Sequence, residues 1–180
     1  MYDRNKTCCF SGHRPEKLLG GADIHSEDTR RLLSMLKLVI NQAVEQGYRY
    51  FITGMARGVD LWAAQMVVEI KQYNPEIKLI CAMPYKLHGS TFRGIDKWDF
   101  GTIREAADEV IYVNDSYTKN CMLMRNRFMA DNSSKLIAVV SNYRSGTGQT
   151  IRYAKSIGLD VHTIDINENA PYFTKIQSKL

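Results

Sequence analysis

The chain has 180 residues, of which 44% are hydrophobic and 24% are charged. This length suits one α/β domain spanning residues 1–180, and the apolar fraction excludes a globally disordered chain. No apolar run approaches the roughly 18 residues of a membrane span, and the net charge of +5 permits a phosphorylated or nucleic-acid partner without requiring one.

Neither the N-terminal residues nor the cysteine spacing indicates targeting, disulfide cross-linking or metal binding. The N-terminus has no apolar stretch followed by a small-residue cleavage site, so we expect a cytoplasmic protein. The four cysteines form no C-x-x-C pair. We therefore expect buried free thiols, with no disulfide framework, metal site or membrane anchor.

Strand-like and helix-like segments alternate along the chain, which is typical of βαβ units. Ser26 is the expected N-cap of the first helix and Gly47 its expected C-terminal stop. The pattern predicts a Rossmann-like three-layer α/β/α domain with a mostly parallel central sheet. Strands are expected over residues 7–10, 48–53, 77–83, 109–113, 135–140 and 161–164. Helices are expected over residues 26–46, 59–73, 97–107, 117–132 and 149–157, and the tail from Asn169 has room for one more.

The segment directly after the first strand is the first candidate for ligand contact, since ligands of open parallel sheets bind beyond the carboxyl ends of the strands. Gly12 lets a ligand approach the backbone, Arg14 suits a phosphate or carboxylate, and His13 can donate a hydrogen bond near neutral pH. The alternative is an ordinary turn with a solvated arginine.

A glycine-flanked turn follows the second strand. Gly54 and Gly58 bracket Arg57, and such a strand-to-helix turn points free backbone N–H groups at an anion. The segment matches neither G-x-G-x-x-G nor the Walker A motif. Asp60, in the first turn of the following helix, is either a partner of the helix dipole or an acceptor for a ribose hydroxyl.

A second glycine loop lies between the fifth strand and the next helix. Gly146, Thr147, Gly148 and Thr150 combine small residues, hydroxyl groups and a helix N-terminus, which suits a phosphate cradle. Two such loops at equivalent edges of one sheet indicate a ligand site more strongly than either does alone.

The predicted helix over residues 117–132 carries two arginines. Arg125 shares a helical face with Met122 and Met129, so it is either an arginine at the edge of the core or one directed into a ligand cleft. Arg127 points elsewhere and is expected to be a surface charge.

The polar loop over residues 85–100 is a candidate lid, and it contains His88, Thr91 and Arg93. Trp98 either stacks on a base or packs in the core.

Together these residues reveal a resemblance. Residues 53–60, TGMARGVD, resemble the S-G-x-A-x-G-[IV]-D signature of the DNA-processing protein DprA. Met122, Arg125 and Met129, followed by Gly146-x-Gly148, are similar to the signature of the "Lonely guy" (LOG) phosphoribohydrolases. Both groups belong to the SLOG superfamily of Rossmann-like nucleotide-binding domains. The chain resembles, over nearly its whole length, a bacterial family of single-domain, DprA-like SLOG proteins of unknown function.

The resemblance implies a binding or sensor protein for a phosphorylated nucleotide-like small molecule, without a further cofactor, and a homodimer is implied by the same likeness. The implied ligand-binding residues are Gly12, His13, Arg14, Gly54, Arg57, Gly58, Asp60, Arg125, Gly146, Thr147, Gly148 and Thr150.

Two other functions stay open. One is a nucleotide or nucleotide-sugar hydrolase. LOG enzymes use an arginine, matched by Arg125, and a glutamate, whose place is taken here by about Arg152. The other is a DprA-like protein that binds single-stranded DNA through phosphate contacts.

Overall fold

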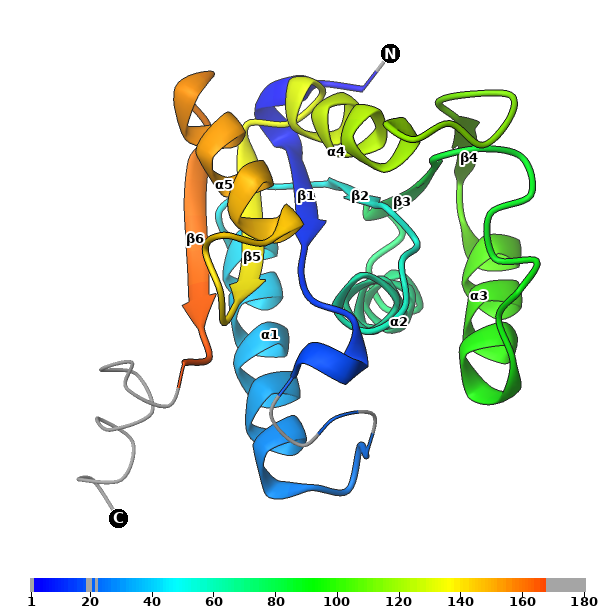
Figure 1. Ribbon diagram of the computed structural model, residues 1–180. Coiled ribbons are helices and arrows are strands. Elements are labelled where there is room, and N and C mark those ends of the chain that lie inside the picture. The colour runs from blue at the N-terminus through cyan, green and yellow to red at the C-terminus, as the bar shows by residue number, and fades with distance from the viewer. Residues whose placement is uncertain (1, 19–20, 22, 168–180) are drawn as a thin grey trace.

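The computed structural model describes residues 2–18, 21 and 23–167. Six parallel strands form one central sheet in the order β4-β3-β2-β1-β5-β6 (Figure 1). All six expected strands are present, and the sheet is parallel throughout. The helix proposed from Asn169 lies outside the described residues. The strands are β1 (Thr7–Ser11), β2 (Tyr50–Thr53), β3 (Lys78–Met83), β4 (Glu109–Tyr112), β5 (Lys135–Val140) and β6 (Asp160–Asp165).

The alternation of side chains along the strands divides the core into two halves. Cys9 of β1 lies in register with Ile52 of β2 and Leu136 of β5, and all three side chains join one hydrophobic cluster. Their neighbours along β1, Cys8 and Phe10, face the opposite cluster. Both faces of the central strands are therefore buried, as in other parallel sheets.

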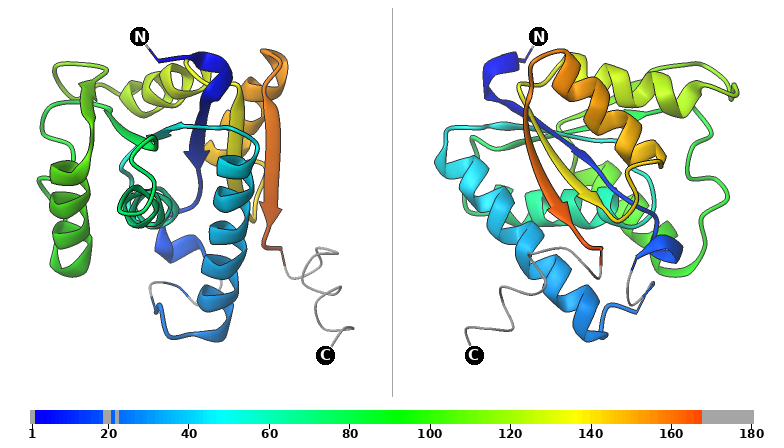
Figure 2. Two further views of the ribbon diagram at one scale, coloured as in Figure 1. Left: turned by 180° about the vertical axis from the view of Figure 1, so that it is seen from behind. Right: turned by 60° about the vertical axis from the view of Figure 1, so that its left-hand side comes forward.

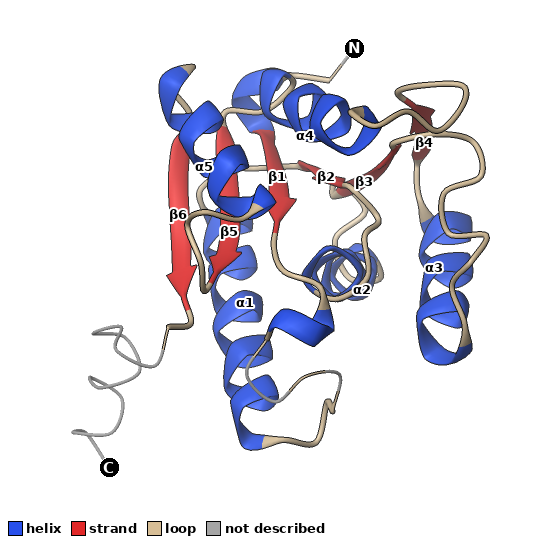
Figure 3. Cartoon of the chain, viewed as in Figure 1, coloured by secondary structure: helices blue, strands red, loops and turns tan. Residues whose placement is uncertain are grey.

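Five α-helices cover the two faces of the sheet (Figures 2 and 3). One hydrophobic cluster joins the sheet to three of them, and the other cluster joins it to the remaining two. The result is the expected three-layer α/β/α arrangement. The first group is α1 (Glu27–Glu45), α2 (Val59–Lys71) and α3 (Gly94–Ala106), and the second is α4 (Cys121–Asp131) and α5 (Gly146–Ser156). Two short 3-10 turns, Arg4–Lys6 and Pro15–Lys17, flank β1.

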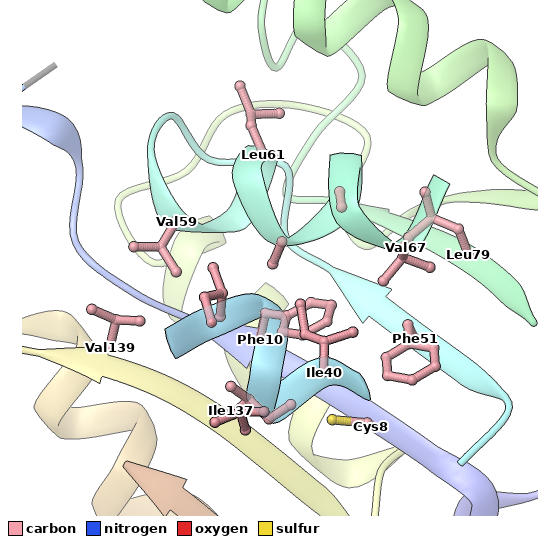
Figure 4. Packing of buried hydrophobic residues seen from close by; sticks show 14 of the residues in the cluster. Cys8, Phe10, Ile40, Phe51, Val59, Leu61, Val67, Leu79, Ile137 and Val139 are labelled. Atoms are coloured by element: carbon pink, nitrogen blue, oxygen red, sulfur yellow. The ribbon is translucent and has the colours of Figure 1, made fainter. Parts of the chain in front are cut away.

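The larger cluster lies between the sheet, α1 and α2 (Figure 4). The rings of Phe10 and Phe51, from neighbouring strands, stack with centroids 6.0 Å apart. Ile40 of α1 and Val59 of α2 belong to the same cluster. This packing fixes α2, and with it the turn that precedes α2, against the end of β1.

Helix ends follow their capping residues. Ser26 caps α1 by accepting a hydrogen bond from the Thr29 N–H at 3.2 Å, and Gly47 has φ +95° just beyond the helix, as expected. The expected starts of three helices were wrong by a turn. Helix α3 begins three residues early and α4 four residues late. Helix α5 begins at Gly146 because Ser145 caps it, so the expected loop over residues 146–148 is its first turn.

The four cysteines are free, buried thiols. Burial raises the pKa of Cys9 and of Cys81 to about 12, so neither thiol ionises at neutral pH. No helix among residues 2–18, 21 and 23–167 is long and apolar enough to cross a membrane.

Candidate ligand-binding cleft

A cleft of about 780 Å³ opens where the strand order reverses. From β1 the chain continues to β2, β3 and β4 on one side, whereas β5 and β6 lie on the other. Loops from the carboxyl ends of β1 and β5 therefore diverge at this point, which is where open α/β sheets bind ligands. The cleft is lined by the segments after β1, β2 and β3, by α4 and by the start of α5.

The structure brings most of the expected site residues together in this cleft. Eight of them line it: Gly12, His13, Arg14, Arg57, Asp60, Arg125, Gly146 and Thr147. The other four, Gly54, Gly58, Gly148 and Thr150, are not part of the lining and act in packing or in hydrogen bonds that hold it.

The glycines outside the lining permit close approaches within the protein. A Cβ atom at Gly54 would collide with the Arg125 guanidinium, and one at Gly148 would collide with the Tyr143 carbonyl. Gly58 has φ +83°, and an added Cβ would lie 2.7 Å from the His13 carbonyl oxygen. These glycines therefore shape the cleft without contacting its contents.

Thr150 connects α5 to α4. Its hydroxyl donates to the Gly146 carbonyl at 3.0 Å and accepts from the Asn126 side-chain amide at 2.9 Å. Asn126 itself lines the cleft, although it was not among the expected ligand-binding residues; in the LOG-like motif it takes the place of the lysine that follows the arginine. This connection fixes the first turn of α5 relative to Arg125.

His13 holds the segment after β1 against its neighbours. Its ring is 4% exposed, and Nε2 accepts a hydrogen bond from the Ser141 N–H at 3.0 Å. Burial lowers the pKa of His13, with a smaller contribution from the charge of Lys17. The imidazole is therefore neutral near pH 7, and because Nε2 is an acceptor, the proton is on Nδ1.

The floor of the cleft contains a buried arginine and a buried aspartate. Arg125 is 5% exposed and Asp60 4%. The Arg125 Nη1 donates to the Gly54 carbonyl and lies 3.4 Å from Asp60 Oδ2, while Nη2 lies 4.0 Å from the Met122 sulfur. Arg125 Nε is buried with no hydrogen-bond partner in the described part of the chain. The guanidinium thus retains unused donors.

Asp60 is held inside the turn that precedes α2. Burial raises its pKa, and the opposing charge of Arg125 and a hydrogen bond from the Ala56 N–H, 3.4 Å from Oδ2, moderate the rise. The carboxylate lies in the first helical turn, where it interacts favourably with the α2 dipole. Its expected role as a dipole partner is therefore compatible with this geometry, and its contact with a ribose stays a prediction.

The start of α5 is open toward the cleft. The Ser145 hydroxyl accepts from the Gly148 N–H at 3.2 Å, and the first turn has no acidic residue. Within the described residues, the N–H groups of Gly146 and Thr147 and the Thr147 hydroxyl have no hydrogen-bond partner. Thr147 is only 5% exposed and lines the cleft. These groups are therefore available to an anion.

Two arginines at the cleft differ in their partners. Arg57 pairs with Glu16 at 2.6 Å and with Asp96 at 2.5 Å, so it connects the segment after β1 to α3. Arg14 is exposed and makes no ion pair with any described residue. Arg14 is consequently the freer of the two to bind a ligand.

The segment after β3 forms one wall of the cleft. His88 Nε2 donates to the Met55 carbonyl at 2.9 Å, where Met55 has a left-handed φ of +56°. Burial lowers the pKa of His88 to about 4, so its ring is uncharged at neutral pH. Trp98 is 69% exposed and outside the cleft lining. Of the two roles expected for Trp98, core packing is wrong because the side chain lies on a solvent-facing side of α3, and stacking on a base stays a prediction.

Known proteins resemble both the sequence and the fold. The chain is 30% identical over 138 residues to the uncharacterized SPbeta prophage-derived protein YoqJ of Bacillus subtilis, covering 69% of this chain and 81% of YoqJ. It is 28% identical over 110 residues to a UPF0398 protein of Halalkalibacterium halodurans, covering 58% of this chain and only 56% of that relative.

Two solved structures share the fold. One is from work on the single-stranded DNA binding mode of DNA processing protein A from Helicobacter pylori, with TM-score 0.61, 17% identity and coverage of 96% of this chain and 72% of that one. The other is DprA from Streptococcus pneumoniae, with TM-score 0.63, 21% identity and coverage of 96% and 56%. At these identities the likeness concerns the fold alone. The model of the YspA SLOG family matches residues 8–168, and the chain belongs to that family.

Proposed function

We propose that the cleft binds a phosphorylated, nucleotide-like small molecule, and that the protein is a binding or sensor module for it. One observation carries this proposal: unused hydrogen-bond donors from separate elements converge on a single cleft. Arg14 follows β1, Arg125 comes from α4, and Thr147 begins α5. A phosphate would occupy the start of α5, where free N–H groups and the positive end of the helix dipole coincide.

The state of Arg125 supports an anionic ligand in particular. Burying a guanidinium is costly unless its donors are satisfied. Among the described residues, Asp60 is the only carboxylate that forms an ion pair with Arg125, at 3.4 Å, and Nε has no hydrogen-bond partner there. An anionic group in the cleft would satisfy donors that the protein leaves unused.

The pairing of the cleft's carboxylates with arginines favours binding of a nucleotide over its hydrolysis. Two carboxylates line the cleft, Asp60 and Asp96, and each already faces an arginine. Arg152, at about the place of the LOG glutamate, donates to the Tyr143 carbonyl at 2.7 Å and is not part of the lining. A free carboxylate that could stabilise an oxocarbenium-like charge is therefore not among the described lining residues.

Single-stranded DNA is the second candidate ligand. One protein with this fold, DNA processing protein A from Helicobacter pylori, binds single-stranded DNA. Arg14, Lys17 and Arg93 lie at the cleft and make no ion pair with described residues. Phosphate contacts of this kind predict an affinity that falls steeply with salt. A labelled oligonucleotide that does not bind at low salt would eliminate this candidate.

Thermal unfolding in the presence of nucleotides, dinucleotides, ADP-ribose and nucleotide sugars tests the first candidate. A ligand of the native state adds about 2.7 kcal/mol at a hundredfold excess over its Kd. For a chain of this size that corresponds to a rise in Tm of roughly 5–10 °C.

Arg14→Ala and Thr147→Val should reduce the rise, and the exposed Arg127→Ala on α4 should not. Equal shifts in all three variants would eliminate the cleft as the binding site. The homodimer implied by the resemblance also remains a proposal, and sedimentation analysis would test it.

A further inference from the structure

Aromatic side chains form the wall of the cleft opposite α5. Tyr85 and Phe92, from the segment after β3, are half-buried and line the cleft. His88 lies between them, with its ring centroid 5.8 Å from Tyr85 and 5.5 Å from Phe92. Met122 of α4 also contributes to the lining. We call Tyr85, His88 and Phe92 the aromatic wall.

The aromatic wall is held in place from behind. The buried Phe100 of α3 makes edge contacts with His88 at 5.9 Å and with Phe92 at 5.4 Å. Gly89 lets the segment lie directly on Phe100, because an added Cβ would be 2.6 Å from that ring. The hydrogen bond from His88 to the Met55 carbonyl fixes the other side. The rings are thus positioned before any ligand arrives, which lowers the entropic cost of binding.

The aromatic wall and the proposed phosphate site at the start of α5, which we call the anion site, are well separated. The wall follows β3 and the anion site follows β5, and the sheet order places β2 and β1 between these strands. Three strand spacings amount to about 14 Å. One ligand that uses both regions must be elongated, with its negative charge at one end and an apolar, planar group at the other.

We infer that the aromatic wall is the subsite for the base of the ligand, so that the cleft selects a nucleotide over a phosphorylated sugar lacking a base. The inference rests on the proposed function, since it assumes that the phosphate occupies the start of α5. Aromatic side chains interact with any base through stacked or edge-to-face contacts, and such contacts tolerate different bases. The wall is also uncharged, because burial keeps His88 neutral. It therefore recognises an aromatic ring rather than a second phosphate.

Binding of two sets of probes to the full chain tests this assignment. Isothermal titration with AMP, GMP, CMP and UMP is compared with titration by ribose 5-phosphate, for the wild type, Tyr85→Leu and Phe92→Leu. Leucine keeps an apolar side chain while removing the ring. Tyr117→Leu is the matched control, because Tyr117 contacts Tyr85 with centroids 5.5 Å apart but is 68% exposed and outside the lining.

The wild type should bind at least one nucleotide more tightly than ribose 5-phosphate. The two wall variants should weaken nucleotide binding by roughly five- to hundredfold, the range for a lost base–aromatic stack, and leave ribose 5-phosphate unchanged. Equal weakening of both kinds of probe, or no weakening, overturns the inference while the proposed function stands. If neither these probes nor the dinucleotides, ADP-ribose and nucleotide sugars of the thermal unfolding test bind even at millimolar concentration, the proposed function fails and the inference fails with it.

Discussion

The starts of α2 and α5 look alike in sequence but differ in electrostatic state. Each follows a strand, contains two glycines and points its N-terminus toward the cleft. At α2 the Asp60 carboxylate lies inside the first turn, and the first N–H, of Val59, faces the His13 carbonyl at 3.4 Å. At α5 the first turn has no carboxylate, and the N–H groups of Gly146 and Thr147 have no partner among the described residues.

The difference teaches that glycines alone do not identify an anion site. Glycine at position 54 makes room for the Arg125 guanidinium, whereas at position 146 an added Cβ would meet nothing within 4 Å. The charge within the first turn decides which helix start is available. On this basis we assign α2 to structural support of the cleft and propose the start of α5 as its anion site.

The largest effect is expected from removing the charge inside the α2 turn. Asp60→Asn leaves the buried Arg125 without its counter-charge, so the free energy of unfolding should fall by about 3 kcal/mol, measured by urea denaturation. Asp115→Asn, which removes a solvent-exposed carboxylate paired with Lys86, should leave stability unchanged. Similar losses in both variants would show that the buried pair has no special role.

A matched pair of glycine substitutions compares the two turns directly. Gly54→Ala should lower the free energy of unfolding by about 2 kcal/mol, because the new methyl group displaces Arg125. Gly146→Ala should cause no loss, because it adds a methyl group to open space at a helix start. Equal stabilities in urea denaturation would contradict the assigned roles of the two glycines.

The pH dependence of the free energy of unfolding tests the ionisation of Asp60. A carboxyl group whose pKa is raised by folding stabilises the native state while protonated, and this contribution is lost as pH rises from about 4 through the folded pKa. Arg125→Met removes the charge that moderates the rise, so stability should fall more steeply with pH than in the wild type. One group contributes at most about 1.4 kcal/mol per pH unit.

Urea denaturation at several pH values between 4 and 8 measures that slope. The double variant Asp60→Asn, Arg125→Met should lose the steeper fall of stability with pH that Arg125→Met shows. If the steeper fall persists in the double variant, a group other than Asp60 is responsible.

The smallest expected effect distinguishes the role of the α5 cap in stability from its role in ligand binding. Ser145→Ala removes the hydroxyl that accepts from the Gly148 N–H, which should lower stability by about 1 kcal/mol and weaken phosphate-ligand binding. Ser26→Ala removes the equivalent cap of α1 and should cost similar stability while leaving ligand affinity intact. If Ser145→Ala and Ser26→Ala lost ligand affinity equally in the thermal-shift assay, the α5 cap would act only through stability.

The fold was largely predictable because strand spacing and helical periodicity are local properties. Buried β1 and β5 contain the uninterrupted apolar runs CCF and LIAVV, and the alternation of strands and helices implies parallel crossovers. The starts of α3, α4 and α5 were not predictable to within a turn. Ser145, for example, could be recognised as a cap only once its hydroxyl was seen to accept from Gly148.

The site was predictable in outline for a similar reason. Residues directly after β1 and at the start of α5 must lie at one edge of a parallel sheet, so Arg14 and Thr147 could be proposed from sequence. The involvement of Asn126 and Tyr85 depends on how α4 and the segment after β3 fold over that edge. Likewise, the engagement of Arg57 by Glu16 and Asp96 joins segments 41 and 39 residues apart, which no local pattern encodes.

The central position of β1 also has a consequence for folding. Its partner β5 begins at Lys135, so the pairing of Cys8 with Lys135 closes a loop of more than a hundred residues. Contacts this distant in sequence form slowly. During synthesis from the N-terminus, one edge of β1 is unpaired until the chain has emerged as far as β5, which ends at Val140 of 180 residues. The cleft lies at this same junction, so it cannot form before β5 has paired with β1, and the ligand binding that we propose there would report on that long-range pairing.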